Sequence, residues 1–392
     1  MLRLALLTVA GISVLGCAEI EPMDSQPKAI ELIEDLRIGG LDGAVEYTFG
    51  SVSAVAPAPD GSIYVADRQG PVVRRYEADG NHVADVGRPG QGPGEYMAVD
   101  GLGVADDGTL MLYDQANGRL SRFSRDGEFT GSISVPNAFG GEDSFVYSRD
   151  GSAFVLAFPE TGPIESREGL FADWARVEPD GSLDRIIRVP LAEPEGPRYV
   201  VSGRGGPYRP FNTLTLSALG PDGALFSVRN HEYRIRRERP DGSVFEISRN
   251  EEPIRATRDE IRQFEAFSEA SARPPGRDRA DYFPIPETKP FIRELVVDLE
   301  GRLWVSRYTD PVFMEYSEWE RQDREEKGRP PFQWRDALRW DVFDADGQLI
   351  GVVTFPFKTT FVTAMGTTAW GVQGGDFEED YIVRWRLRDP LE

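Results

Sequence analysis

Residues 60–80 are DGSIYVADRQGPVVRRYEADG, and this stretch sets the pattern from which the fold can be deduced. Two apolar segments, residues 62–66 and 72–76, lie between the Asp-Gly pairs at its two ends. Asp-Gly favours tight hairpin turns, because Gly accepts positive φ and the Asp side chain hydrogen-bonds its own backbone. The stretch therefore predicts strands b and c of a four-stranded antiparallel unit, with Asp-Gly at the a–b and c–d turns.

The Asp-Gly dipeptides recur along the chain with a fixed internal spacing. Those at Asp60 and Asp79, at Asp107 and Asp126, and at Asp222 and Asp241 form pairs with the same separation. In a fifth unit Glu300-Gly301 replaces the first Asp-Gly of the pair. The pattern predicts six units, at residues 52–87, 101–136, 143–190, 212–249, 291–355 and 359–388.

The sixth unit contains only three predicted strands, whereas residues 30–38 form a strand that no unit uses. One four-stranded sheet buries little apolar surface, but several sheets packed face to face bury a continuous core. Pairing the N-terminal strand with the last unit closes a ring and hides two sheet edges. The predicted fold is therefore all-β: a six-bladed β-propeller of four-stranded antiparallel blades, with the last blade closed by the N-terminal strand.

Two motifs resemble those of a known family. The segment 61–67 followed by 72–80 is similar to the NHL-type six-bladed β-propeller repeat, and 87–95 (GRPGQGPGE) resembles the blade-joining segment of bacterial propeller lipoproteins. The resemblance covers most of the chain after residue 30 and is clearest in the first two units. The third and fifth units depart from it through insertions, and a seven-bladed ring would need one further repeat hidden there.

The N-terminus has the features of a bacterial export signal. Arg3 precedes an apolar stretch at residues 4–14, which is shorter than the ~20 residues needed to span a bilayer. It ends in Val14-Leu15-Gly16-Cys17, which resembles a lipobox; the resemblance implies cleavage before Cys17 and lipidation of its thiol. An ordinary signal peptide with an incidental cysteine is the alternative.

The expected division is a lipoprotein signal peptide at 1–16, the lipidated Cys17 with a tether at 17–29, and the propeller at 30–392. Ala18 resembles the residue found in lipoproteins sent to the outer membrane.

Composition excludes several classes of function. The 44 Lys and Arg against 66 Asp and Glu give a net charge of −22, which argues against a nucleic-acid partner. The single cysteine excludes an intrachain disulfide and a thiolate metal cluster, and the two histidines exclude a three-histidine metal site.

The distribution of loop lengths predicts which face of the ring carries function. In a four-stranded blade the a–b and c–d turns lie on one face, here named the turn face, and the b–c and d–a connections lie on the other. The long insertions, at 189–213, 248–292 and 306–340, all fall on the second face, here named the insertion face.

Loops on a rigid scaffold often carry function. The insertions are nearly neutral and rich in arginine and aromatic residues, which suits recognition of a ligand or partner. The predicted ligand-binding residues are Arg204, Tyr208, Arg209, Lys289, Arg307, Tyr308 and Trp334. The alternative for each aromatic is packing of the insertions onto the propeller.

The second insertion predicts a helix. Thr257 and Glu260 fit a capping box, and Ile261, Phe264 and Phe267 follow on one stripe. The helix is expected to lie across the insertion face, either as a static packed element or as a moving lid.

Few residues fit a catalytic role. Asp67 and Asp114 follow strand b of blades 1 and 2, where a carboxylate either holds a loop amide or ligates calcium in the channel. His231 is expected on the insertion face as a lone surface histidine, with a general base or a single metal ligand as the alternative. His82 is expected on the turn face, so the two cannot act together. Propeller lyases use several histidines, and no Ser or Cys nucleophile system is supported. No catalytic residue is predicted.

The leading functional prediction is a membrane-tethered, non-enzymatic binding or scaffold module that presents the insertion face to a protein or glycan ligand. The expected location is the bacterial cell envelope, at the outer membrane. The alternative is a calcium-dependent lactonase-like or esterase-like hydrolase, because lactonase-like six-bladed propellers hold calcium at the channel mouth with Glu, Asn and Asp. Candidates for that set are Glu95, Asn212, Glu287 and Asp310. No cofactor other than that calcium is expected, and a scaffold without a small-molecule ligand is the third choice.

Overall fold

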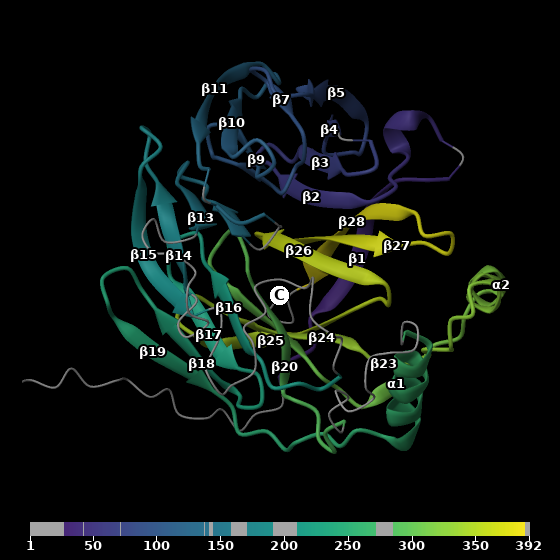
Figure 1. Cartoon of the computed structure of the whole chain (residues 1–392). Coiled ribbons are helices and arrows are strands. Elements are labelled where there is room, and N and C mark those ends of the chain that lie inside the picture. Colours follow the sequence, from purple (N-terminus) through teal and green to yellow (C-terminus); the bar gives the residue numbers. More distant parts are fainter. Residues whose placement is uncertain are drawn as a thin grey trace, which may run out of the picture.

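The computed structural model of the chain describes residues 27–41, 43–70, 72–136, 138–140, 144–157, 171–190, 210–271 and 285–388. They form six four-stranded antiparallel sheets arranged as the blades of a ring (Figure 1). The predicted six-bladed β-propeller is confirmed.

Each blade has its strands in the order a to d from the channel outward. Blade 1 contains β2 (Val52–Pro57), β3 (Ile63–Asp67), β4 (Val72–Tyr76) and β5 (His82–Val86). Blade 2 contains β8 (Gly101–Val104), β9 (Leu110–Asp114), β10 (Arg119–Phe123) and β11 (Phe129–Ser134). Blade 3 contains β12 (Phe145–Tyr147), β13 (Ala153–Ala157), β14 (Phe171–Val177) and β15 (Leu183–Pro190).

The second half of the ring repeats this arrangement. Blade 4 contains β16 (Thr215–Leu219), β17 (Leu225–Arg229), β18 (Arg234–Glu238) and β19 (Val244–Ser248). Blade 5 contains β20 (Ile292–Val297), β21 (Leu303–Arg307), β24 (Leu338–Phe343) and β25 (Leu349–Phe355). Blade 6 contains β26 (Thr359–Met365), β27 (Thr368–Gly374), β28 (Asp380–Arg388) and, as its outermost strand, β1 (Glu31–Ile38).

The N-terminal strand closes the ring, as predicted. β1 pairs antiparallel with β28, from Glu31 opposite Arg388 to Ile38 opposite Ile382. Just before β1, the Ile30 amide donates to the Val352 carbonyl, and the Val352 amide donates to the Lys28 carbonyl, both at 2.8 Å. The N-terminal segment therefore joins the outer strand of blade 5 to blade 6.

The Asp-Gly turns have the conformation that their sequence requires. Gly61 and Gly80 adopt φ values of 85° and 88°, in the region that favours glycine. The Asp60 carboxylate accepts a hydrogen bond of 2.9 Å from the Ser62 amide, two residues later. Local residue chemistry thus fixes the hairpins that the spacing predicts.

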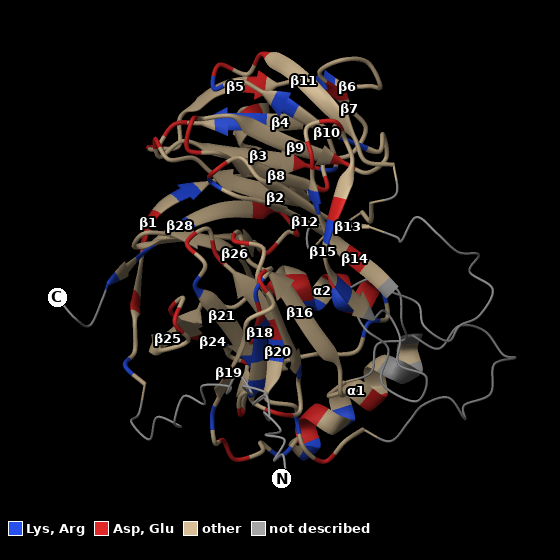
Figure 2. Cartoon of the chain, turned by 90° about the vertical axis from the view of Figure 1, so that its left-hand side faces the viewer, with Lys and Arg blue, Asp and Glu red and all other residues tan. Residues whose placement is uncertain are grey.

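The core lies in the seams between neighbouring blades. In the first seam, Leu112 and Phe123 of blade 2 pack against Tyr64 and Val73 of blade 1. The outer surface carries Lys and Arg interspersed with Asp and Glu over the strands visible in Figure 2.

The remaining elements lie in the connections. They are η1 (Val45–Tyr47), β6 (Arg88–Pro89), β7 (Glu95–Tyr96), α1 (Arg258–Ser271), β22 (Pro311–Phe313), α2 (Glu318–Glu326) and β23 (Trp334–Asp336). Within the part of the chain that the structure describes, no helix has the length and apolar character needed to cross a membrane.

Candidate functional site: the insertion face

The second and third insertions fold together on the insertion face. α1 lies in the d–a connection between blades 4 and 5, whereas the β22–β23 hairpin and α2 lie in the b–c connection of blade 5. Figure 1 shows both helices and β23 at one side of the ring. Two segments that are far apart in sequence thus form one continuous surface.

Lys289 holds this surface together from the inside. Its side chain is 0% exposed, and its ammonium group lies 2.9 Å from the Asp336 carboxylate and 2.7 Å from the Thr309 carbonyl. It also forms an ion pair with Glu260, in the first turn of α1. Because a buried charge is tolerated only when it is paired, Lys289 fixes the start of α1 to the hairpin.

α1 begins at the predicted capping box. The Glu260 amide donates to Thr257 Oγ1 at 3.3 Å, and the Thr257 amide donates to the Glu260 carboxylate at 2.9 Å. The Trp334 amide donates to Gln263 Oε1 at 2.9 Å, and Gln263 Nε2 donates back to the Trp334 carbonyl.

The apolar stripe of α1 packs against two other segments. The Phe264 ring lies edge-on to Phe211 at 5.3 Å and to Phe332 at 5.0 Å between ring centroids. The buried Gln263 and Phe264 favour the static alternative for this helix, whereas Phe267 is 36% exposed and has its ring 6.1 Å from that of Phe332.

Arg307 lies in a separate buried network between blades 4 and 5. Its guanidinium group is 3.0 Å from Glu251 and 3.5 Å from Asp341, whose side chain is 0% exposed. Arg249 pairs with the same two carboxylates, at 2.9 and 3.2 Å. The Tyr233 hydroxyl donates to Asp341 at 2.7 Å. Burial and, to a smaller extent, the Asp341 charge raise the pKa of Tyr233 well above its usual range, so this hydroxyl keeps its proton.

The structure places the predicted ligand-binding residues in different environments. Cys17, Arg204, Tyr208 and Arg209 lie outside the described residues. Lys289 and Arg307 are buried in the two networks above. Tyr308 lies beside Phe211 and under the Arg293 guanidinium group, at 5.8 and 5.6 Å. Trp334 is partly exposed.

Two exposed apolar residues of the third insertion were not among the residues predicted from the sequence. Val312 is 42% exposed and Phe313 is 47% exposed, and the Phe313 ring lies edge-on to Trp334 at 5.1 Å. These three residues are named the hairpin ridge. The available signal was the short apolar run Val312-Phe313-Met314 in the third insertion.

The two aspartates that follow strand b hold loop amides. Asp67 accepts hydrogen bonds from Gly50 and Ser51, at 3.0 and 3.1 Å, and Asp114 accepts one from Met97 at 2.9 Å. This supports the structural alternative for both residues. Asn230 has the same role in blade 4, where its Oδ1 accepts from the Leu214 amide at 2.8 Å.

The histidines have local carboxylate partners. His231 is 3.4 Å from Glu232, and His82 is 3.0 Å from Asp85. His231 and His82 belong to different blades, so neither completes a catalytic pair with the other.

The candidates for a calcium site lie in different connections of the ring. Glu95 binds Arg88 Nε and the Gly92 amide, each at 2.8 Å, in the connection between blades 1 and 2. Glu287 lies within the second insertion, where its carbonyl accepts from the Ala256 amide, and Asp310 precedes β22. Among the described residues, no three His, Cys, Asp or Glu side chains are grouped closely enough to hold a metal ion.

Comparison with known proteins supports the fold. A family model described as a 6-bladed beta-propeller matches residues 39–159. A member of the DUF4221 family from Bacteroides vulgatus is 12% identical, with a TM-score of 0.54 over 93% of this chain and 100% of that chain. A protein from Bacteroides fragilis, titled a "putative exported protein", is 11% identical, with a TM-score of 0.50 over 94% of this chain and 98% of that chain.

A gluconolactonase from Xanthomonas campestris is 16% identical over 96% of this chain and 99% of that chain, with a TM-score of 0.41. That score is too low to carry an argument about activity. The chain has no match among curated protein sequences. Similarity at these levels of identity establishes the propeller fold alone.

Proposed function

We propose that this protein is a binding module of the bacterial cell envelope, anchored by a lipid on Cys17, that presents its insertion face to a protein or glycan partner. The observation that carries the proposal is the hairpin ridge. Two insertions pack into one rigid surface and leave an aromatic side chain and its apolar neighbour exposed at its edge. Exposed aromatic residues on a rigid support are typical anchors of binding surfaces.

The rigidity of the support strengthens this interpretation. Phe313 and Trp334 pair across β22 and β23, and the Trp334 backbone is held by Gln263 of α1. An aromatic residue fixed in this way loses little conformational entropy when it binds.

The path of the N-terminal segment supports the proposed orientation. β1 starts opposite Arg388, at the turn-face end of blade 6, and runs toward the insertion face. The segment before it pairs in parallel with β25 through Ala29 and Val352, so it also approaches from the turn-face side. A tether from Cys17 would therefore place the turn face toward the membrane and leave the insertion face free for a partner.

One set of variants tests both the anchor and the binding surface. In the source bacterium, the full-length chain should fractionate with membranes, and Cys17→Ser should move most of it to the soluble fraction. The soluble Cys17→Ser protein should bind envelopes prepared from cells that lack it. Adding Val312→Ser and Phe313→Ser should reduce that binding about tenfold or more, because hot-spot truncations cost ~2 kcal/mol.

A matched control distinguishes the effect of the hairpin ridge from the effect of removing any exposed apolar side chain. Val83 is 44% exposed and lies on β5, just after a c–d turn of the turn face. Val83→Ser should leave binding unchanged. Membrane association that survives Cys17→Ser would contradict the proposed lipid anchor. Equal envelope binding by all the variants would contradict the proposed role of the hairpin ridge in binding.

A further inference from the structure

The β22–β23 hairpin that carries the ridge is a two-stranded ribbon whose two edges differ. Phe313 lies directly opposite Trp334, and at the next position along the ribbon the Met314 amide donates to the Gln333 carbonyl at 2.8 Å. Because hydrogen-bonded and non-hydrogen-bonded pairs alternate in an antiparallel ribbon, Phe313 and Trp334 form a non-hydrogen-bonded pair. The amide and the carbonyl of both residues therefore point away from the partner strand.

The edge formed by β23 is closed by α1. The Trp334 amide donates to Gln263 Oε1 at 2.9 Å, and the Trp334 carbonyl accepts from Gln263 Nε2. The carboxamide of Gln263 thus takes the place of a further strand, and its two hydrogen bonds agree with the outward direction of the Trp334 backbone.

The edge formed by β22 is open. Within the described part of the chain, no group donates to or accepts from the amide and the carbonyl of Phe313, whose side chain is 47% exposed. Pro311 also faces outward on β22, where its missing N–H costs the ribbon nothing, which is the usual place of proline in an edge strand. An unpaired strand edge with an exposed apolar residue is a template for pairing with another strand.

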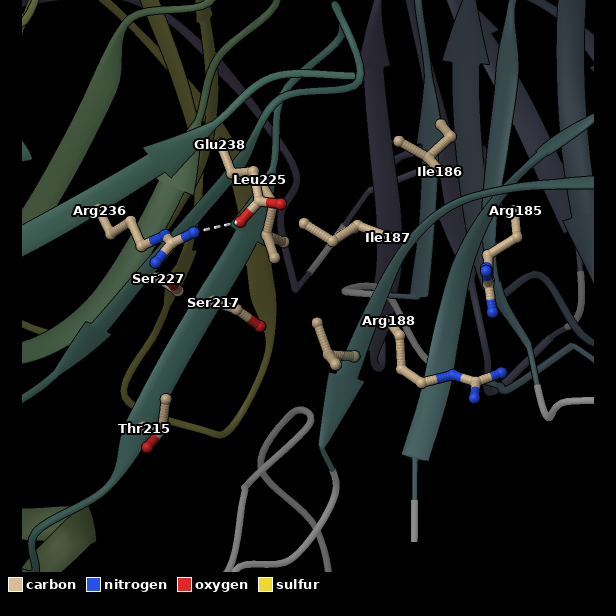
Figure 3. Close-up of a pocket in the computed structure, with 11 residues that line it drawn as sticks. Arg185, Ile186, Ile187, Arg188, Thr215, Ser217, Leu225, Ser227, Arg236 and Glu238 are labelled. Carbon is tan, nitrogen blue, oxygen red and sulfur yellow. Dashed lines mark hydrogen bonds and ion pairs between the residues drawn. The ribbon is translucent and has the colours of Figure 1, made fainter. Parts of the chain in front are cut away.

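Outer strands of several blades are protected against such pairing. β15 carries the charged residues Asp184, Arg185 and Arg188, and the two arginines are visible in Figure 3. β11 is interrupted by a bulge beside Gly131, and the segment 28–30 covers part of the edge of β25. Charges, bulges and covering segments are devices by which sheet proteins avoid edge-to-edge association. β22 instead exposes an aromatic residue at its edge.

The charges beside β22 favour a basic partner. Asp310 and Glu315 flank the strand, both are exposed, and no described residue forms an ion pair or a hydrogen bond with either carboxylate. Residues 308–320 contain no Lys or Arg. Lys or Arg side chains at the ends of a bound strand would therefore meet unpaired carboxylates, and complementary charges of this kind favour association.

We infer that β22 pairs with an extended, basic segment of a partner protein, which adds a third strand to the ribbon and packs its apolar side chains against Phe313. This pairing rests on the proposed function and narrows the partner of the hairpin ridge to a protein. Main-chain hydrogen bonds along the edge supply affinity, and the alternate side chains of the added strand supply specificity.

A fluorescein-labelled peptide, Lys-Thr-Val-Thr-Val-Thr-Lys, provides the test, because its sequence alternates like a strand between two basic ends. The soluble Cys17→Ser protein should bind this peptide, as measured by fluorescence anisotropy. A peptide with proline in place of the central threonine pairs poorly as a strand, and a peptide with glutamates at both ends has the opposite charge. Each should bind about tenfold or more weakly than the basic peptide.

Two substitutions at one position separate the contribution of the backbone from that of the side chain. Phe313→Ala removes the ring and keeps the N–H, whereas Phe313→Pro removes both. Phe313→Pro should weaken peptide binding about tenfold more than Phe313→Ala does, because it also leaves an acceptor of the bound peptide unpaired. Equal binding by the two variants would overturn the proposed strand pairing.

A further pair of variants keeps the test decisive if Phe313→Pro does not fold. Asp310→Asn with Glu315→Gln should weaken binding of the basic peptide about fivefold at low ionic strength. Asp126→Asn with Glu128→Gln is the matched control and should leave binding unchanged, because both residues are exposed at a c–d turn of blade 2, on the turn face.

Three results would each overturn the strand pairing: no binding of the basic peptide, equal binding of the proline-containing peptide, or unchanged binding after Asp310→Asn with Glu315→Gln. If envelope binding still depended on Val312 and Phe313, the proposed function would stand, and the partner would be recognised without strand pairing. Envelope binding that did not depend on Val312 and Phe313 would contradict the proposed function itself.

Discussion

A chain that begins at residue 39, and so lacks β1, is expected to melt about 10 °C or more below the intact protein or to be insoluble. β1 provides the fourth strand of blade 6, and without it the edge of β28 is exposed. Ile38 is only 2% exposed, and Leu32 and Leu36 also pack into the cores at the two sides of blade 6.

The size of the effect follows from this burial. Burial of an aliphatic side chain contributes ~1.5–3 kcal/mol, so three such residues supply roughly 5 kcal/mol even when two are only partly buried. That is a large part of the ~5–15 kcal/mol that stabilises a typical domain. Thermal unfolding followed by circular dichroism measures the change.

A chain that begins at residue 27 is the control, because it keeps β1 and the pairing of Lys28 and Ile30 with Val352. It should melt within about 2 °C of the intact protein, since small changes away from the core have little effect on stability. Equal melting temperatures for the chains beginning at 27 and at 39 would show that the ring does not depend on the N-terminal strand.

Arg307→Ala is expected to lower the free energy of unfolding by about 3 kcal/mol, the lower end of the cost of breaking a buried ion pair. The variant removes one of the two arginines that face Asp341 and Glu251, and it leaves Asp341 buried with less compensation. Burial lowers the pKa of Arg307, but Asp341 and Glu251 outweigh it and raise that pKa, so the guanidinium group is charged throughout the accessible pH range. Urea unfolding at neutral pH measures the loss.

Arg234→Ala provides the comparison for an exposed arginine. Arg234 lies on β18, its side chain is 61% exposed, and its closest carboxylate, on Glu246, is 3.7 Å away. Its removal should change stability by no more than about 0.5 kcal/mol. If Arg307→Ala changed the free energy of unfolding equally little, Arg307 would not be needed for stability and could bind a ligand, as the sequence alone suggests.

The architecture was predictable because it depends on local and periodic signals. Asp-Gly turns between short apolar segments define the blades, and the missing strand in the sixth unit identifies the role of residues 30–38. Loop lengths then select the insertion face. The helix start at Thr257 and Glu260 was predictable for the same reason, since a capping box is a local motif.

The roles of individual charged residues were not predictable, because they depend on contacts between distant segments. Lys289 and Asp336 are 47 positions apart and meet only because two insertions pack together. A lysine in an aromatic-rich insertion has the same sequence signature whether it is buried or exposed. Ser217 and Ser227 of blade 4 are an intermediate case. They are visible in the sequence as polar breaks in apolar strands, but only the strand register shows that they lie opposite each other.

Site-specific photo-crosslinking of the full-length protein in living cells tests whether the insertion face binds a partner. A photoreactive benzoylphenylalanine replaces Phe313 on the hairpin ridge in one strain and Val83 in another. Val83 is similarly exposed, at 44%, but it lies on β5 just after a turn of the opposite face. A discrete crosslinked product is expected at position 313 and none at position 83. Crosslinking at 83 but not at 313, or no product at 313, would contradict the claim that the insertion face binds the partner.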